Sequence, residues 1–103
     1  MGHVYEGTFT HGDWYQVICD GYPLDPKPSQ EISNHSPDGF SWGYGGAGPA
    51  QLALAILLLE AEPTVARKHY MDFKREVIAK LDRDSFFLTS ADVQEWLTSK
   101  QVA

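Results

Sequence analysis

The stretch that most constrains the fold is GFSWGYGGAGPAQLAL, positions 39 to 54, in which a glycine-rich loop runs directly into an apolar segment. Pro49 suits the first turn of a helix, where its missing N–H has no helical partner in any case. The near-continuous apolar run from Leu52 to Leu59 is typical of a helix that is covered on most sides. The sequence therefore predicts a buried central helix that begins near Pro49.

The residues before this helix are typical of β-structure. Residues 4 to 9 and 14 to 19 are rich in strand-forming types, and Gly12-Asp13 between them marks a turn, so a hairpin is predicted. Asp20-Gly21 is a second turn signal, after which residues 22 to 24 form a short third strand that Pro23 limits. Two further prolines then predict that regular structure ends, which leaves a long loop from 25 to 48 packed on the core.

Two more helices are expected after the central one. Thr89-x-x-Asp92 resembles a capping box that opens a short closing helix with Val93, Trp96 and Leu97, and residues 85 to 88 form a short extended piece before it. Because the β elements precede the α elements, the chain is predicted to be a single α+β domain over residues 1 to 103. The helix before the extended piece shows one apolar face at helical spacing: Ala66, Tyr70, Phe73, Val77, Ile78 and Leu81.

The charges are unevenly distributed along the chain. Residues 1 to 60 hold one base and seven acids, whereas residues 61 to 103 hold seven of each, so the net charge of -6 lies in the first part. An acidic surface repels a phosphate backbone, which disfavours direct binding of DNA or RNA. Two interpretations stay open: a solvated face that aids solubility, and a contact surface for a basic partner protein through Asp13, Asp20 and Asp25.

The glycine loop does not fit the known phosphate-binding motifs. Gly43-x-Gly45-x-x-Gly48 formally matches the dinucleotide fingerprint, but that motif requires a strand after its helix, and here another helix follows. Pro49-Ala50 stands where a P-loop has lysine and serine or threonine. The sequence therefore predicts neither a nucleotide hydrolase nor a bound cofactor.

Two interpretations of the loop remain. In the first, the glycines only allow tight packing of aromatic side chains around the helix start. In the second, free N–H groups at the helix N-terminus and aromatic faces bind a small anionic, nucleotide-like ligand. The candidate ligand residues are His35, Phe40, Trp42, Tyr44, Gly45, Gly46, Gly48 and Gln51.

Catalytic and metal sites are not predicted. His35 is a candidate general base, but no nucleophile or acid stands beside it in sequence, and a loop-bracing hydrogen bond is the favoured role. The single cysteine, Cys19, cannot form an internal disulfide and is predicted to be a buried strand residue, which agrees with a reducing compartment. No metal site is expected, because metal-binding spacing is absent among His3, His11, His35 and His69.

Two features bear on localisation. The longest apolar run, residues 52 to 59, is far shorter than the roughly 20 residues that span a bilayer. The N-terminus MGHVYEGTFTHGDW has no basic region followed by an apolar stretch, so it does not look like a signal peptide. A cytoplasmic protein without membrane contact is expected.

The run NHSPDGFSWGYGGAGPAQLALAILL, positions 34 to 58, resembles a family of small proteins found in bacteria, phages and other mobile elements. Its hallmark is HSP-x-GF-x-WGYGGSGPAQLALAIL. The resemblance covers nearly the whole chain, although Ala47 stands where the family usually has serine. The family has no known function, so the resemblance implies domain boundaries and a phage or mobile-element origin, with the host cytoplasm as the place of action.

Three hypotheses follow. The leading one is a non-enzymatic binding protein that acts on a host protein, with interference in host defence as its most concrete version. The second is a small-ligand binder that uses the loop from 40 to 51. The third, an enzyme, requires His35 and a partner from elsewhere in the fold.

Overall fold

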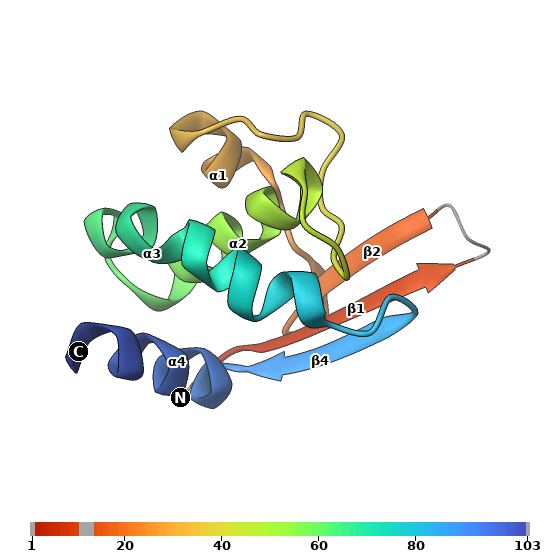
Figure 1. The fold of residues 1–103 in the computed structure, drawn as a ribbon. Helices are drawn as coiled ribbons and strands as arrows, with labels where there is room; N and C mark the ends of the chain where they lie inside the picture. Colours follow the sequence, from red (N-terminus) through yellow and green to blue (C-terminus); the bar gives the residue numbers. More distant parts are fainter. Residues whose placement is uncertain (1, 11–13, 103) are drawn as a thin grey trace.

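The computed structural model describes residues 2–10 and 14–102 (Figure 1). The described chain is a single α+β domain, as the order of the elements predicted. In chain order these are β1 (Val4–Thr10), β2 (Trp14–Cys19), β3 (Tyr22–Pro23), α1 (Lys27–Ile32), α2 (Ala47–Glu60), α3 (Pro63–Glu76), a 3-10 turn η1 (Ile78–Lys80), β4 (Ser85–Thr89) and α4 (Ser90–Val102).

The strands form one antiparallel sheet in the order β3-β2-β1-β4. The predicted hairpin and short third strand are confirmed, while the predicted turn at Gly12-Asp13 lies outside the described residues. The extended piece from Ser85 to Thr89 pairs with β1, where Phe86 stands opposite Gly7. The sequence did not predict this pairing, because tertiary packing brings two strands so distant in the chain together.

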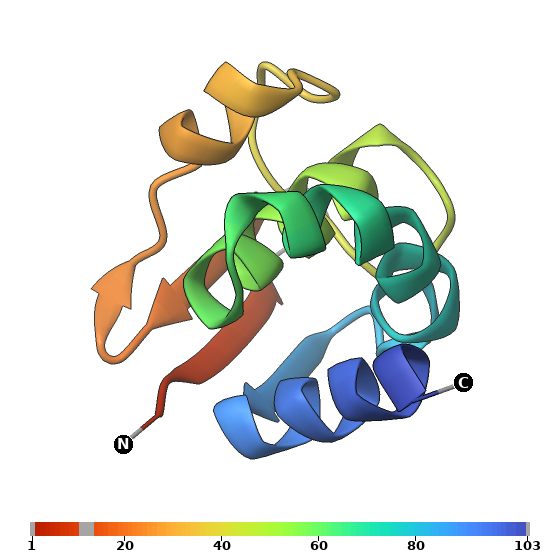
Figure 2. The ribbon, with the colours of Figure 1, turned by 90° about the vertical axis from the view of Figure 1, so that its left-hand side faces the viewer.

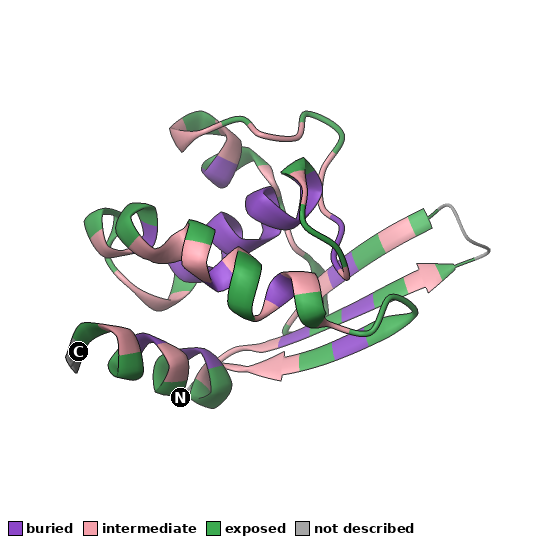
Figure 3. Cartoon of the chain, in the orientation of Figure 1, coloured by how far each residue is buried: buried purple, intermediate pink, exposed green. Residues whose placement is uncertain are grey.

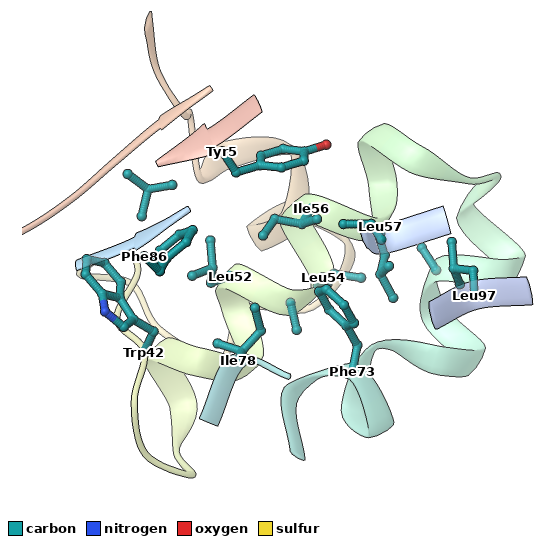
Figure 4. Close-up of a cluster of buried hydrophobic side chains, with 14 residues drawn as sticks. Tyr5, Trp42, Leu52, Leu54, Ile56, Leu57, Phe73, Ile78, Phe86 and Leu97 are labelled. Atoms are coloured by element: carbon teal, nitrogen blue, oxygen red, sulfur yellow. The ribbon is translucent and has the colours of Figure 1, made fainter. Parts of the chain in front are cut away.

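Helix α2 is the centre of the core. It begins two residues before Pro49, and its residues from Gly48 to Leu57 are all buried, which confirms the predicted central helix. Leu52 lies toward Phe86 of the sheet and Leu54 lies toward Phe73 of α3 (Figure 4). In Figures 1 and 2, α1 lies at the top and α4 at the bottom, with α2 and α3 between them.

The sheet has one covered and one open face. Buried and exposed residues alternate along β1 and β4, as Figure 3 shows, because successive side chains point to opposite faces. On the open face Trp14 and Phe87 are 65% and 62% exposed.

The predicted loop from 25 to 48 is corrected in its first part, because Lys27–Ile32 forms α1. Pro26 and Pro28 occupy the cap and first turn of this helix, where a missing N–H leaves no hydrogen bond unmade. The Asp25 carboxylate accepts a hydrogen bond from the Lys27 N–H at 2.9 Å. The prolines therefore start a helix, and the irregular segment runs from 33 to 46.

The start of α4 agrees with the sequence prediction, whereas the end of α3 differs from it. The capping box is confirmed, since Asp92 accepts from the Thr89 N–H at 3.0 Å and the Asp92 N–H donates to the Thr89 hydroxyl at 3.2 Å. The predicted helix through Leu81 ends earlier, at Glu76, because the backbone leaves helical geometry at Val77 and continues as η1. Within the described residues, no helix has the length and apolar character needed to cross a membrane.

Candidate functional site

An open groove of about 860 Å³ lies between β2 and the glycine loop. Residues 14 to 17 of β2 line one side, and Phe40, Tyr44 and Gly48 line the other. These three are members of the predicted ligand set. The groove continues past Leu24 toward the start of α1.

The Trp42 side chain lies behind this groove, in the core. It is fully buried, its indole N–H donates to the Asp82 carbonyl at 2.9 Å, and its ring meets the rings of Tyr15 and Phe86 edge-on. This predicted ligand residue therefore joins the loop to the sheet and to the segment before β4.

Gln51 is a fully buried polar side chain of α2 with four hydrogen bonds. Its oxygen accepts from the N–H groups of His35 and Ser36, at 2.8 and 2.9 Å. Its nitrogen donates to the Ser29 hydroxyl and the Ser33 carbonyl, at 2.9 and 3.1 Å. Gln51 thereby ties α1 and the segment from 33 to 36 to the central helix.

His35 braces the same segment. Its Nε2 lies 3.1 Å from the Ser33 hydroxyl and 2.7 Å from the Tyr70 hydroxyl of α3. Both neighbours are hydroxyl groups, and His35 is not among the residues that line the groove. These contacts support the loop-bracing role that the sequence favoured.

Two glycines of the loop, Gly48 and Gly43, are required for different reasons. A Cβ on Gly48 would stand 1.9 Å from the Ser41 hydroxyl oxygen, so the loop can lie against the start of α2 only because this side chain is absent. Gly43 has φ +83°, a conformation that favours glycine. Gly45 is exposed, and Gly46 is the residue that precedes α2. The inner side of the loop is thus a tight turn, and its outer side is a groove wall.

The predicted acidic contact residues have different surroundings. Asp20 and Asp25 are both exposed, and Asp13 lies outside the described residues. The Asp25 carboxylate also accepts from the Lys27 N–H at the start of α1. A hydrogen bond from His3 and another from the Val4 N–H lower the pKa of the Asp20 carboxyl below its usual value. Asp38 also lines the groove, and nothing in its spacing along the sequence showed where the loop would place it.

A second cluster lies at the open end of the hairpin. The Nδ1 of His3, the Sγ of Cys19 and a carboxylate oxygen of Asp20 all lie within 4.8 Å of one another. Cys19 is partly exposed, where a buried residue was predicted, because it stands at the end of β2. Partial burial and the neighbouring Asp20 raise the pKa of the Cys19 thiol to about 11. This thiol is therefore neutral near pH 7, which does not suit a catalytic nucleophile.

A family of unknown function (DUF6166) matches residues 5–99, and the chain therefore belongs to this family. No curated protein and no solved structure matches it.

Proposed function

We propose that this member of the DUF6166 family is a non-enzymatic binding protein that holds an extended, basic segment of a partner protein in the groove beside β2. The observation that carries the proposal is an unpaired stretch of strand edge along the groove. The acidic charge and the apolar side chains of the groove lining support the proposal further.

The unpaired stretch follows from the register of the sheet. The Asp20 N–H donates to the Val4 carbonyl, and in an antiparallel pair the hydrogen-bonded positions alternate, so the backbone of Gln16 faces β1 and that of Tyr15 faces away. On that far side, β3 pairs with residues 18 and 19, and the Leu24 N–H reaches Val17. Within the described residues, no strand continues this pairing to Tyr15.

An open strand edge beside a groove favours an extended peptide as the occupant. A peptide strand added to the edge forms main-chain hydrogen bonds, and its alternate side chains enter the groove or point to solvent. The aromatic rings of Phe40 and Tyr44 and the side chain of Leu24 supply apolar contact for the inward side chains.

The charge around the groove favours a basic peptide. Asp38 is the only charged residue of the groove lining among the described residues, so no lysine or arginine there offsets its charge. Opposite charges of this kind raise the association rate and select against acidic partners.

In its more specific form, the proposal is that the partner protein belongs to a host cell. The resemblance to proteins of phages and mobile elements supports a partner in the host cytoplasm, with interference in host defence as the biological outcome. The hydrogen-bonded state of His35 supports a binding role over an enzymatic one.

The test is selection from a random peptide display library on the full chain. We expect enriched peptides to be rich in lysine and arginine, and their association to slow as salt screens the charges within about 8 to 10 Å. Asp38→Asn and Asp25→Asn should slow association, whereas Asp84→Asn, at an exposed site in the electrically neutral half, should not. Enrichment of no basic peptide, or binding that neither salt nor Asp38→Asn alters, would contradict the proposal.

A small anionic ligand is the second candidate, because Ala47 and Gly48 bring the N-terminus of α2 to the groove. The Asp38 carboxylate in the same lining opposes an anion. Screening nucleotides and cyclic dinucleotides by thermal shift separates the two candidates. We expect no shift, and a reproducible rise in melting temperature would favour the ligand instead.

A further inference from the structure

We propose that His3, Cys19 and Asp20 bind a divalent transition-metal ion, with zinc as the type that the donor atoms favour. The neutral Cys19 thiol would lose its proton to solvent when the metal ion binds. The resulting thiolate, with an imidazole and a carboxylate, suits zinc rather than magnesium or calcium, which prefer oxygen donors. No sequence spacing indicated this site, because His3 precedes β1, whereas Cys19 is the last residue of β2 and Asp20 follows it.

One pair of donor atoms already has the spacing of a tetrahedral site. Bonds of about 2.0 to 2.3 Å to zinc place neighbouring donor atoms about 3.3 to 3.8 Å apart. The Sγ of Cys19 lies 3.7 Å from the Oδ2 of Asp20, within that range. The Nδ1 of His3 lies 2.6 Å from the same oxygen, so this pair has to open by about 0.7 Å to take an ion between its atoms.

The backbone around the donors is held in place. The His3 N–H donates to the Ser90 hydroxyl at 2.6 Å, and the Ser90 N–H donates to the His3 carbonyl at 2.9 Å, so His3 is fixed from both sides. The Oδ1 of Asp20 accepts from the Val4 N–H at 2.8 Å, which orients the carboxylate and leaves Oδ2 toward His3. The Val4 N–H thus supports the ligating carboxylate directly, and hydrogen bonds to ligating groups raise metal affinity.

The site is open to solvent. The side chains of His3 and Asp20 are 38% and 45% exposed, so an ion reaches them without unfolding. Three protein donors leave a fourth position for water or for a donor from another molecule, as in zinc sites that exchange ligands.

Cobalt(II) titration of the untagged, reduced full chain tests the site. We expect one equivalent to bind with a thiolate-to-cobalt charge-transfer band in the near ultraviolet, and zinc to displace it. Cys19→Ala should abolish the band, and His3→Ala and Asp20→Asn should weaken binding at least about tenfold. The matched control is His69→Ala, a partly exposed histidine of α3 outside the cluster.

Three results would overturn the proposal: no saturable binding at micromolar cobalt, a complex without the charge-transfer band, or undiminished affinity in Cys19→Ala. If His3 and Asp20 only form an ion pair beside a neutral thiol, no saturable cobalt binding is expected. Circular dichroism shows whether each variant is folded. If Asp20→Asn does not fold, the band of the unaltered chain and its loss in Cys19→Ala decide the question.

Discussion

Replacing Trp42 by alanine should lower the free energy of unfolding by about 3 to 5 kcal/mol, the scale of a large core truncation. The ring is fully buried against Tyr15 and Phe86, and the substitution also leaves the Asp82 carbonyl without its indole donor. Chemical denaturation followed by circular dichroism measures the change.

Trp14→Ala is the matched control for Trp42→Ala. Trp14 is 65% exposed at the start of β2, and substitutions at such surface sites usually change stability by no more than about 0.5 kcal/mol. Similar losses in the two variants would show that burial does not decide the role of Trp42. A stable Trp42→Ala protein would contradict its placement in the core.

Replacing Gln51 by leucine should also lower the free energy of unfolding substantially. The substitution keeps the volume and the helix but removes the acceptor of two backbone N–H groups, of His35 and Ser36. Each buried donor left unpaired costs about 1 to 3 kcal/mol, so a loss of at least about 2 kcal/mol is expected. Amide hydrogen exchange should also become faster at Ser36, because its anchor is gone.

Gln101→Leu, at an exposed position of α4, controls for the loss of a glutamine in general. It should leave both stability and exchange at Ser36 unchanged. Unaltered exchange at Ser36 in Gln51→Leu would mean that the segment from 33 to 36 does not depend on the central helix for its order.

The sequence predicted those parts of the fold that local patterns determine. The apolar run to Leu59 gave the central helix, and Thr89 with Asp92 gave the cap of α4, because helix burial and capping depend on residues a few positions apart. The pairing of β4 with β1 depends on contacts distant in sequence. Pro26 and Pro28 predict an end of regular structure because they remove strand-ladder donors, whereas in the structure they occupy the cap and first turn of α1.

The candidate site was less predictable than the fold. Trp42 and Tyr44 stand two positions apart in an irregular loop, where no periodicity tells which side chain is inward, and the structure sends Trp42 to the core and Tyr44 to the groove. The place of Asp38 in the groove, and the cluster of His3, Cys19 and Asp20, could not be predicted because only folding brings these residues and their neighbours together.

The most direct test of the binding groove is amide hydrogen exchange by NMR at Tyr15 and Gln16, with and without a peptide selected from the display library. The Tyr15 N–H faces away from β1 and should become protected when a peptide strand pairs with it. The Gln16 N–H already faces β1 and should change little, which makes it an internal control. Protection of Tyr15 in the complex is the result that the proposal predicts. Tight peptide binding with unchanged exchange at Tyr15 would contradict it.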